Sequence, residues 1–596
     1  MSEEGLGLFA GKDKPTVEWG WDHYEKAKQF NRSINLEDTV KANENFYIGK
    51  QWEGVNANGL PTPQFNFLKR VGGFTIANLV ADSIKMNASV MAAFPEDERL
   101  IDPVRIVNEE LEALNEQNRL PAMTKEFARD AAVRGDGCIF TWWDEKANAG
   151  PSTKRKGRIR SEITKNTSVF FGNPNDKDVQ DQPWIMIEKR EMARNVKIRA
   201  KANGIEGWEQ IQPDDEENDA VDGVKHTDGK VTTVMLFWKD DDTGEVWEFE
   251  FCHNCVIKKA ENLNIRLYPV VWLCWDYVAD CYHGQAMITG LIPNQIFVNK
   301  AWAMSQLSIM RTAYPKYIYD KTRISHLDNG VGRAIGVAGN VDNAIKAMDT
   351  GHIEPQVFQY IQAAISQSEE SLGATEAALG EGKAYNTSAI LSLQKAASTP
   401  QELTKQNLYQ QIEDLARIYL EFMAEYYGKR TVDMPMNDEM RALFEQANQL
   451  AEAAGQPPQE IPKTVPVEFY FSMLKDHPFS VKIDVGASSY YSEVSSLSTL
   501  DNLLLNGHIN IVQYLEHIPD GTVAGRRELI EELKQQMEEQ QQMAEQQAMM
   551  EQQMQMEQQA AATPEVAENE ATEEQKTTGF KELGEALRSV ERRQQG

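Results

Sequence analysis

Residues Gly373–Gly428 read GATEAALGEGKAYNTSAILSLQKAASTPQELTKQNLYQQIEDLARIYLEFMAEYYG, and this stretch decides the fold. Pro400 suits the first position of a helix, and Thr399 with Glu402 forms a T-x-x-E capping box, so a long helix is predicted to begin here. Gly428 is the expected C-cap. Apolar residues recur every three or four positions between these ends, which predicts one buried face and hence a core around it. This core stripe comprises Leu408, Ile412, Leu415, Tyr419, Phe422 and Tyr426, widened by Leu403, Ile418 and Met423.

A small polar loop precedes the long helix, with a short helix expected over 387–397 between them. The loop contains Leu379, Gly380, Glu381, Gly382 and Lys383. Loops of this kind carry function more often than core helices do. These five residues are therefore candidate functional residues.

Composition narrows the class of protein. The 596 residues are 41% hydrophobic, which predicts a folded bulk, and 61 basic against 91 acidic residues give a net charge of −30. That balance argues against a protein that grips nucleic acid by neutralising phosphates, although DNA could pass such a protein. Five cysteines without a signal-peptide pattern indicate a reducing compartment. No apolar window is long enough to span a bilayer, so no membrane association is expected.

The N-terminal half predicts an α+β domain with an antiparallel sheet, because short turns join consecutive strands. Helices are expected over 19–46, 67–90, 102–118 and from Pro121 to Arg134. Strands are expected over 138–143, 168–171 and 184–188, followed by a hairpin of 231–238 and 246–251.

The character changes at Gly284, where a long apolar helix is predicted to run to Met310 with a possible kink at Pro293. Two short strands, Lys316–Asp320 and Arg333–Ala338, are expected around Gly-rich turns. Pro355 then opens a second helix to about Leu372. A β unit this small cannot hold a core of its own, so it needs neighbours, most simply copies of itself in a ring.

The C-terminal part is expected to add helices and two returning strands. A helix is predicted over 437–454, strands over 466–474 and 479–485 that return to the first sheet, and a helix pair over 493–506 and 509–518. A third helix from Arg526 runs into a Gln/Met/Glu tract. Residues 561–579 have the composition of a disordered segment, and 580–593 predict a short amphipathic helix.

Motifs of catalysis and metal binding are weak. Cys252 and Cys255 form one C-x-x-C half-site without a partner at zinc-finger spacing, so structural cysteines are favoured over a metal site. Residues 5–12 lack the spacing and the Ser or Thr of a phosphate loop. The sequence therefore indicates a protein that is not an enzyme and needs no cofactor or metal, while dispersed carboxylates leave a hydrolase open.

The order of these parts resembles that of the portal proteins of tailed bacteriophages. The stretches that carry the resemblance are FYIGKQW (46–52), GLIPNQIFVNKAW (290–302), 313–353, 373–428 and 484–519. The resemblance implies a predominantly helical α+β fold. Its parts would be a wing (1–283 and 387–492), two stem helices (284–312 and 354–373), a small β-containing clip (313–353), a tunnel loop (374–386), a long tunnel/wing helix, a crown or barrel of C-terminal helices (493–560) and a flexible acidic tail with a short terminal helix (561–596).

The same resemblance implies a function. About a dozen subunits would form a homo-oligomeric ring, a dodecamer, at one capsid vertex in the virion after assembly in the host cytoplasm. Double-stranded DNA would pass through it, without sequence-specific binding, during packaging and ejection. Partners would be the terminase large subunit, the major capsid and scaffold proteins, and neck or tail adaptor proteins.

The resemblance also gives roles to particular residues. Leu379 to Lys383 would face the DNA, and the clip strands would pair between subunits through Tyr317, Ile318, Tyr319, Ile335, Gly336 and Val337.

Two other classes of function remain open. The Gln/Met tract favours a capsid assembly or scaffold factor that acts through a coiled coil, although such a factor has no need of the long mixed α+β region. A packaging-associated hydrolase with scattered carboxylates is the third reading.

Overall fold

The computed structural model divides into two compact units, Met1–Ser489 and Tyr490–Gly596, and each is described by itself. It describes residues 15–81, 83–90, 101–148, 156–214, 229–313, 317–328, 335–342, 344–347, 356–371, 401–435, 444, 446–448, 464–475, 479–486, 500–506, 509–518, 529–530 and 533. Among the helices in these ranges, none is long and apolar enough to cross a membrane.

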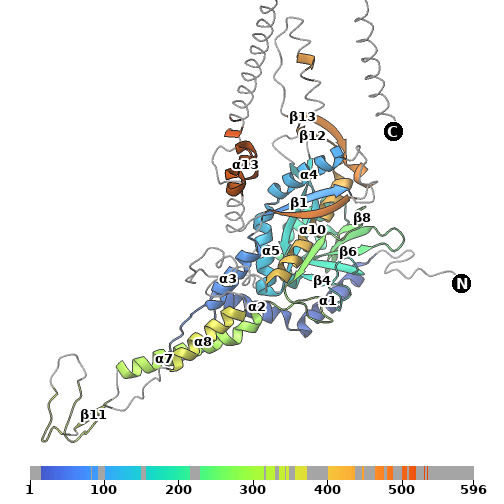
Figure 1. Ribbon diagram of the computed structural model, residues 1–596. Coiled ribbons are helices and arrows are strands. Elements are labelled where there is room, and N and C mark those ends of the chain that lie inside the picture. The colour runs from blue at the N-terminus through green and yellow to red at the C-terminus, as the bar shows by residue number, and fades with distance from the viewer. Residues whose placement is uncertain are drawn as a thin grey trace, which may run out of the picture. The chain divides into compact units, whose positions relative to one another are not determined.

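Five helices build the first part of unit 1 (Figure 1): α1 (Val17–Ser33), α2 (Leu36–Ile48), α3 (Phe67–Leu79), α4 (Ile101–Gln117) and α5 (Leu120–Arg134). Thr16 caps α1 by accepting a hydrogen bond from the amide of Trp19. Gly135 ends α5 with a φ of +103°, and a Cβ there would lie 2.5 Å from the carbonyl oxygen of Gly284. The turn from α5 into the first sheet therefore requires glycine.

Two antiparallel sheets follow. A three-stranded sheet has the order β3-β2-β9, and a five-stranded sheet has the order β4-β5-β6-β7-β8. The strands are β2 (Asp136–Asn148), β3 (Lys156–Thr164), β4 (Val169–Phe171), β5 (Trp184–Met192), β6 (Lys230–Lys239), β7 (Val246–Cys252), β8 (Cys255–Asn262) and β9 (Val270–Cys274), with α6 (Ala193–Ala202) between β5 and β6. The predicted hairpin is β6–β7, in which Lys239 pairs with Val246. Strands β3, β8 and β9 and helix α6 were not predicted.

Helix α10 (Glu402–Tyr426) packs against β9 and anchors the main core. Of the predicted stripe, Leu408, Ile412, Leu415, Tyr419 and Phe422 are buried, as are Ile418 and Met423, and Tyr426 is half-buried. Leu403, which we expected to widen the stripe, is 73% exposed. Thr399 and Pro400 lie outside the described residues. The C-cap is Tyr427, and Gly428 follows it in the left-handed conformation at φ +58°.

Specific polar contacts fix α10 in its place. The Tyr419 hydroxyl lies 2.8 Å from Ser161 Oγ on β3 and accepts a hydrogen bond from Asn118 Nδ2 at 3.2 Å. Burial raises the pKa of Tyr419 to about 12, so its hydroxyl stays protonated and available as a donor. Glu421 accepts hydrogen bonds from the amides of Arg266 and Leu267.

Three parts of the prediction for residues 67–90 and 464–486 are wrong. Ser83–Val90 is not the end of a helix but strand β1, which pairs with β14 (Phe479–Gly486). Strand β13 (Thr464–Tyr470) pairs with β12 (Lys429–Pro435), so β13 and β14 form two separate ribbons instead of joining the first sheet. A short 3-10 helix, Phe471–Lys475, occupies the end of the predicted strand 466–474.

Unit 2 contains α13 (Ile511–His517), which begins with a capping box between Asn510 and Gln513. Residues 500–505 are also helical. Most of the predicted helix 437–454, the Gln/Met tract and the tail 561–596 lie outside the described residues.

Candidate subunit interface and its junction with the body

A two-helix stem extends from unit 1. Helix α7 (Ile292–Ala313) and helix α8 (Gln356–Ser371) run side by side away from the sheets, with β11 beyond their far end (Figure 1). Asn294 donates a hydrogen bond to Ser368 at 2.9 Å near the body, and Trp302 contacts Phe358 further out. Pro293 lies at the start of α7, directly after the 3-10 turn η4 (Thr289–Leu291), and not at a kink. The first stem helix therefore begins at Ile292 and not at Gly284.

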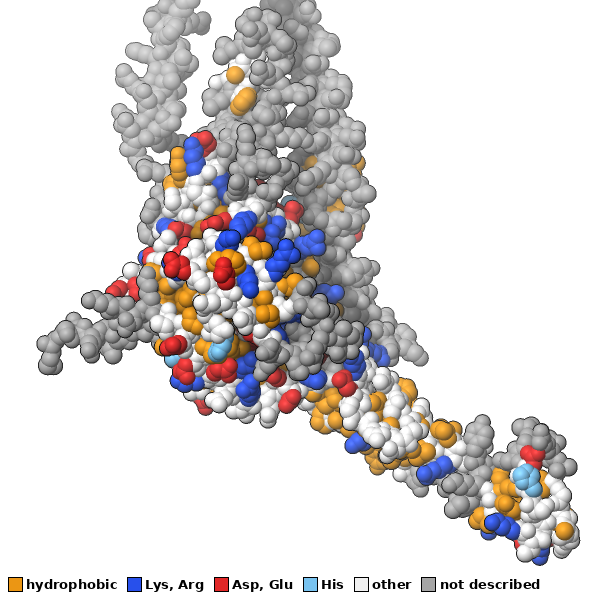
Figure 2. All heavy atoms as spheres, turned by 180° about the vertical axis from the view of Figure 1, so that it is seen from behind, with side chains coloured by type: hydrophobic (Ala, Val, Ile, Leu, Met, Phe, Trp, Pro, Cys, Tyr) orange, Lys and Arg blue, Asp and Glu red, His pale blue; other side chains and the backbone are white. Residues whose placement is uncertain are grey.

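Large apolar side chains lie exposed along both stem helices. Met304 is 66% exposed and Tyr360 is 67% exposed, and similar exposure is found for Phe297, Ile309, Met310 and Phe358. Figure 2 shows these hydrophobic surfaces gathered over the stem. Apolar surface of this extent marks a contact site with another protein.

The stem leads to a small hairpin of β10 (Tyr317–Tyr319) and β11 (Ile345–Ala347), in which Ile318 pairs with Lys346. Our prediction of the second strand at Arg333–Ala338 is wrong: Ile335, Gly336 and Val337 are not in a strand. Among the described residues of 317–347 only Ile324 and Ala344 are fully buried, while Ile318 is 62% exposed. Among the described residues, each strand of this two-stranded sheet is paired along one edge, and its other edge is able to pair with another chain.

A chain of buried amides holds α7 to the body. Asn299 Nδ2 donates to Gln51 Oε1 at 2.6 Å, and Gln295 Nε2 donates to Asn299 Oδ1 at 3.0 Å and to the carbonyl of Phe65 at 2.7 Å. All three amide side chains are buried, and Phe65 stacks on Trp302. Buried polar groups that are fully paired specify one geometry, because any displacement leaves an amide unsatisfied. The structure thereby joins the two quoted stretches 46–52 and 290–302.

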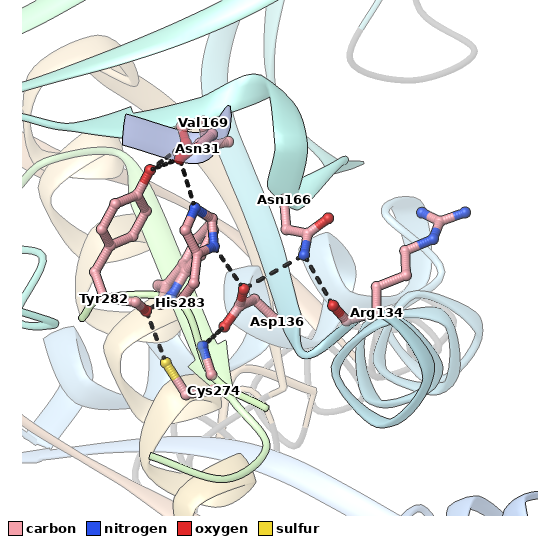
Figure 3. A network of polar contacts seen from close by, with 10 residues as sticks. Asn31, Arg134, Asp136, Asn166, Val169, Cys274, Tyr282 and His283 are labelled. Carbon is pink, nitrogen blue, oxygen red and sulfur yellow. Dashed lines mark hydrogen bonds and ion pairs between the residues drawn. The ribbon is translucent and has the colours of Figure 1, made fainter. Parts of the chain in front are cut away.

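A second polar network lies where the chain passes from β9 toward α7 (Figure 3). Asp136, at the start of β2, is fully buried. Its Oδ2 lies 2.8 Å from His283 Nδ1 and accepts from Asn166 Nδ2 at 3.3 Å, while its Oδ1 accepts from the amide of Gly284 at 2.6 Å. The segment that leads into the stem is therefore attached to the start of β2.

The remaining contact of His283 joins this network to α1. Nε2 lies 3.2 Å from Asn31 Oδ1 on α1, while Nδ1 lies beside Asp136. Both ring nitrogens are therefore within hydrogen-bonding distance of side-chain oxygens, which holds the ring in one orientation. Burial raises the pKa of Tyr282 well above its ordinary value, so its hydroxyl stays protonated, within 3.2 Å of the carbonyl of Val169.

The C-x-x-C pair closes a two-residue turn between β7 and β8, where Cys252 pairs with Cys255 in register. Both are buried, and burial raises the pKa of both thiols, which disfavours the thiolate that a metal requires. Within the described ranges, no group of three His, Cys, Asp or Glu side chains could hold a metal ion.

The predicted tunnel-loop residues Leu379, Gly380, Glu381, Gly382 and Lys383 lie outside the described residues. The buried networks around Gln295 and Asp136 were not predicted. The amide residues Gln51, Gln295 and Asn299 stood out only as polar residues within otherwise apolar stretches, and nothing in the sequence links His283 to Asp136.

An α+β body with a projecting helical stem, exposed apolar stem faces and an open terminal hairpin defines a structural protein that assembles with others. The family can be stated more closely, because the model of the Phage P22-like portal protein family matches residues 22–457. The chain belongs to this family, and it is thus a phage portal protein and a component of the virion capsid. No curated protein gives a significant match to the chain.

Proposed function

We propose that the chain forms a closed ring at one vertex of the phage capsid, and that the genome passes through the centre of this ring during packaging and ejection. The observation that carries the proposal is the stem with its exposed apolar faces and its open hairpin. Met304, Tyr360 and Ile318 are exposed to water in a single subunit. Covering them with other copies of the chain is favourable, because it removes apolar surface from water. Such contacts are heterologous, and they close into a ring when the rotation between subunits allows it.

Electrostatics supports a conduit over a DNA-gripping protein. The chain carries a net charge of −30, and α7 and α8 together contain four charged residues: Lys300, Arg311, Glu369 and Glu370. A wall with so few cations gives DNA little counterion release and therefore little adhesion. Duplex DNA is expected to move past this surface without sequence-specific binding.

The hairpin at the end of the stem is the proposed docking platform for the terminase large subunit during packaging and for neck or tail adaptor proteins afterwards. Its strands have free edges and little core of their own, so β-strand addition by a neighbouring subunit or a partner suits it. The wing is proposed to contact the major capsid and scaffold proteins. Leu379 to Lys383 remain the proposed DNA-facing loop, in which Gly380 and Gly382 permit movement and Lys383 makes weak phosphate contacts.

Native mass spectrometry of the purified chain, with negative-stain images of the same sample, tests the proposal. The expected result is a closed ring near a dozen subunits with a central hole wide enough for a duplex. A monomer or dimer that persists at high concentration and in the presence of scaffold protein would contradict it.

A further inference from the structure

The two stem helices differ in charge. From Gln356 to Ser368, helix α8 contains no charged residue, although 26% of the whole chain is charged. Helix α7 contains Lys300 and Arg311 and no acidic residue. Solvent-facing sides of helices ordinarily carry charged residues, so the uncharged surface of α8 needs an explanation.

The exposed side of α8 is uncharged from Gln356 to Gln367. Its fully buried residues, Ile361 and Ser368, mark the side that is covered. The positions opposite them, at spacings of three and four, are all exposed: Gln356, Gln359, Ala363, Gln367 and Glu370. Three amides and a methyl group thus form a continuous neutral stripe of about three turns, bordered by the exposed Tyr360, and we name it the amide stripe (Gln356, Gln359, Ala363 and Gln367).

The corresponding side of α7 has a different chemistry. Val298, Ala301 and Ser305 are buried, and the opposite positions are occupied by Phe297, Lys300, Met304 and Arg311. Phe297 is 49% exposed and Met304 is 66% exposed, and both cations are exposed as well. This side is apolar and cationic, in contrast to the amide stripe.

We propose that the amide stripe of α8 is the part of the stem that faces the duplex, and that the Phe297–Arg311 side of α7 faces away from it. The proposal rests on the proposed function, because it assigns the channel wall within that ring. Duplex DNA carries a phosphate charge about every 1.7 Å along its axis. A ring repeats each wall residue once per subunit, so a single lysine would become a belt of cations that binds phosphates, and a single carboxylate would become a belt that repels them.

Amides avoid both extremes. They hold a layer of water through hydrogen bonds at no net charge, whereas an apolar wall offers no hydrogen bonds to the water that surrounds the phosphates. The side of α7 with Phe297 and Met304 is the apolar alternative, and Lys300 and Arg311 add the cations that would retain DNA. The amide stripe is therefore the surface of the stem that best permits passage.

Site-specific photo-cross-linking tests the assignment. Gln359→Cys and Gln367→Cys on α8, and Phe297→Cys and Met304→Cys on α7 as matched controls, are each labelled with a maleimide photo-cross-linker in heads arrested during DNA packaging. The unsubstituted protein gives the background of the five native cysteines. After irradiation, the α8 variants should cross-link to DNA several-fold more than the α7 variants. Equal or greater cross-linking from α7, or none above background from α8, would overturn the assignment.

Each variant is first weighed by native mass spectrometry, which separates this inference from the function on which it rests. Rings that package DNA but cross-link from α7 overturn the wall assignment and leave the portal function standing, whereas failure of the unsubstituted chain to form any ring overturns both. A second pair of variants gives a readout without labelling. Gln359→Lys should slow packaging in a way that added salt relieves, and Met304→Lys should not; the reverse pattern would place α7 at the DNA.

Discussion

The Nδ1 atom of His283 lies 2.8 Å from Oδ2 of Asp136, a residue 147 positions earlier in the chain. The pair is fully enclosed, since His283 is 3% exposed and Asp136 is 0% exposed. Asp136 also accepts from the side chain of Asn166 and from the amide of Gly284, so removing its carboxylate leaves buried donors unsatisfied, which costs more than the loss of a surface contact. This relationship ties the segment that leads into the stem to the start of β2.

Asp136→Asn should therefore lower the free energy of unfolding by about 1–3 kcal/mol. Asp144, on the same strand, forms a partly solvated ion pair in which its Oδ2 lies 3.0 Å from Arg160 Nε. Asp144→Asn should lower the free energy of unfolding by about 1 kcal/mol or less. Urea denaturation of the two variants beside the unsubstituted protein measures the difference. Equal losses at both positions would show that the buried pair contributes no more than a surface one.

Glu250 on β7 gives a pH dependence. Burial raises its pKa from 4.5 to about 7 despite the attraction of Arg199, while Glu248 and Glu191 add to the rise. A carboxyl whose pKa is higher in the folded state contributes stability that is complete below its unfolded pKa and is lost as the pH rises through about 7.

The Glu250→Gln variant should consequently have the same free energy of unfolding as the unsubstituted protein at about pH 4. At about pH 8 the variant should be more stable by up to about 3 kcal/mol. Melting temperature measured across this pH range checks the prediction. A stability difference that is independent of pH would contradict it.

Two leucines on α10 provide a matched pair. Leu415 is fully buried in the main core, whereas Leu403, just over three turns earlier on the same helix, is 73% exposed. Leu415→Ala should cost about 2–5 kcal/mol, and Leu403→Ala should stay within about 0.5 kcal/mol in the isolated chain. Thermal or urea unfolding under conditions that keep the chain monomeric distinguishes them. A large loss at Leu403 would show that this end of the helix is covered in solution.

The open hairpin can be tested at Ile318, which is 62% exposed on β10. Ile318→Asp places a charge on the surface that is proposed to meet a neighbouring subunit, and should reduce the fraction of closed rings without changing the circular dichroism of the monomer. Ser325, an exposed residue that follows β10 outside any strand, provides the control. The Ser325→Asp variant should form rings as the unsubstituted protein does. Native mass spectrometry measures both. Normal ring formation by Ile318→Asp would remove β10 from the interface.

Deletion of Leu379 to Lys383 should leave the ring intact and impair DNA packaging or retention, because this loop is proposed to touch the passing duplex. A length-matched variant with five serines separates the need for a loop from the need for these side chains. Ring mass and the amount of packaged DNA are the two readouts. Loss of the ring on deletion would identify the segment as a folding element.

The sequence predicted elements whose partners are near in the chain. The β6–β7 hairpin has a short turn between two strands of β-forming residues. Apolar residues at three- and four-residue spacing predict α8 and α10. The prediction of a helix over Ser83–Val90 failed because the apolar pattern of α3 was read as continuing into these residues. Its alternation of buried Met86 and Ala88 with exposed Lys85 and Asn87 is a strand signal, but its partner β14 begins only at Phe479, 389 residues after Val90.

The candidate site could be predicted only in outline. A two-helix stem follows from the apolar runs on either side of a small β unit, but β11 was misplaced because RAIGVA has stronger strand propensity than Ile345–Ala347. The polar networks could not be predicted at all. Gln51 and Asn299, like Asp136 and His283, meet only through tertiary structure, and one sequence has no signal for such pairs.

The contact between Asn294 and Ser368 has a consequence for how this protein can change. The chain leaves the body and returns to it at one point, and α7 keeps contacts with the body as far as Asn299 and Trp302. The part beyond Trp302 is therefore an insertion whose ends are already joined. Insertions of this kind tolerate exchange and resizing, since the fold that holds them does not depend on their length. Adding or removing matched turns of both helices would alter the reach of the projecting part while leaving the body unchanged. A lineage can thereby adapt one end of the molecule to new partners without redesigning the other.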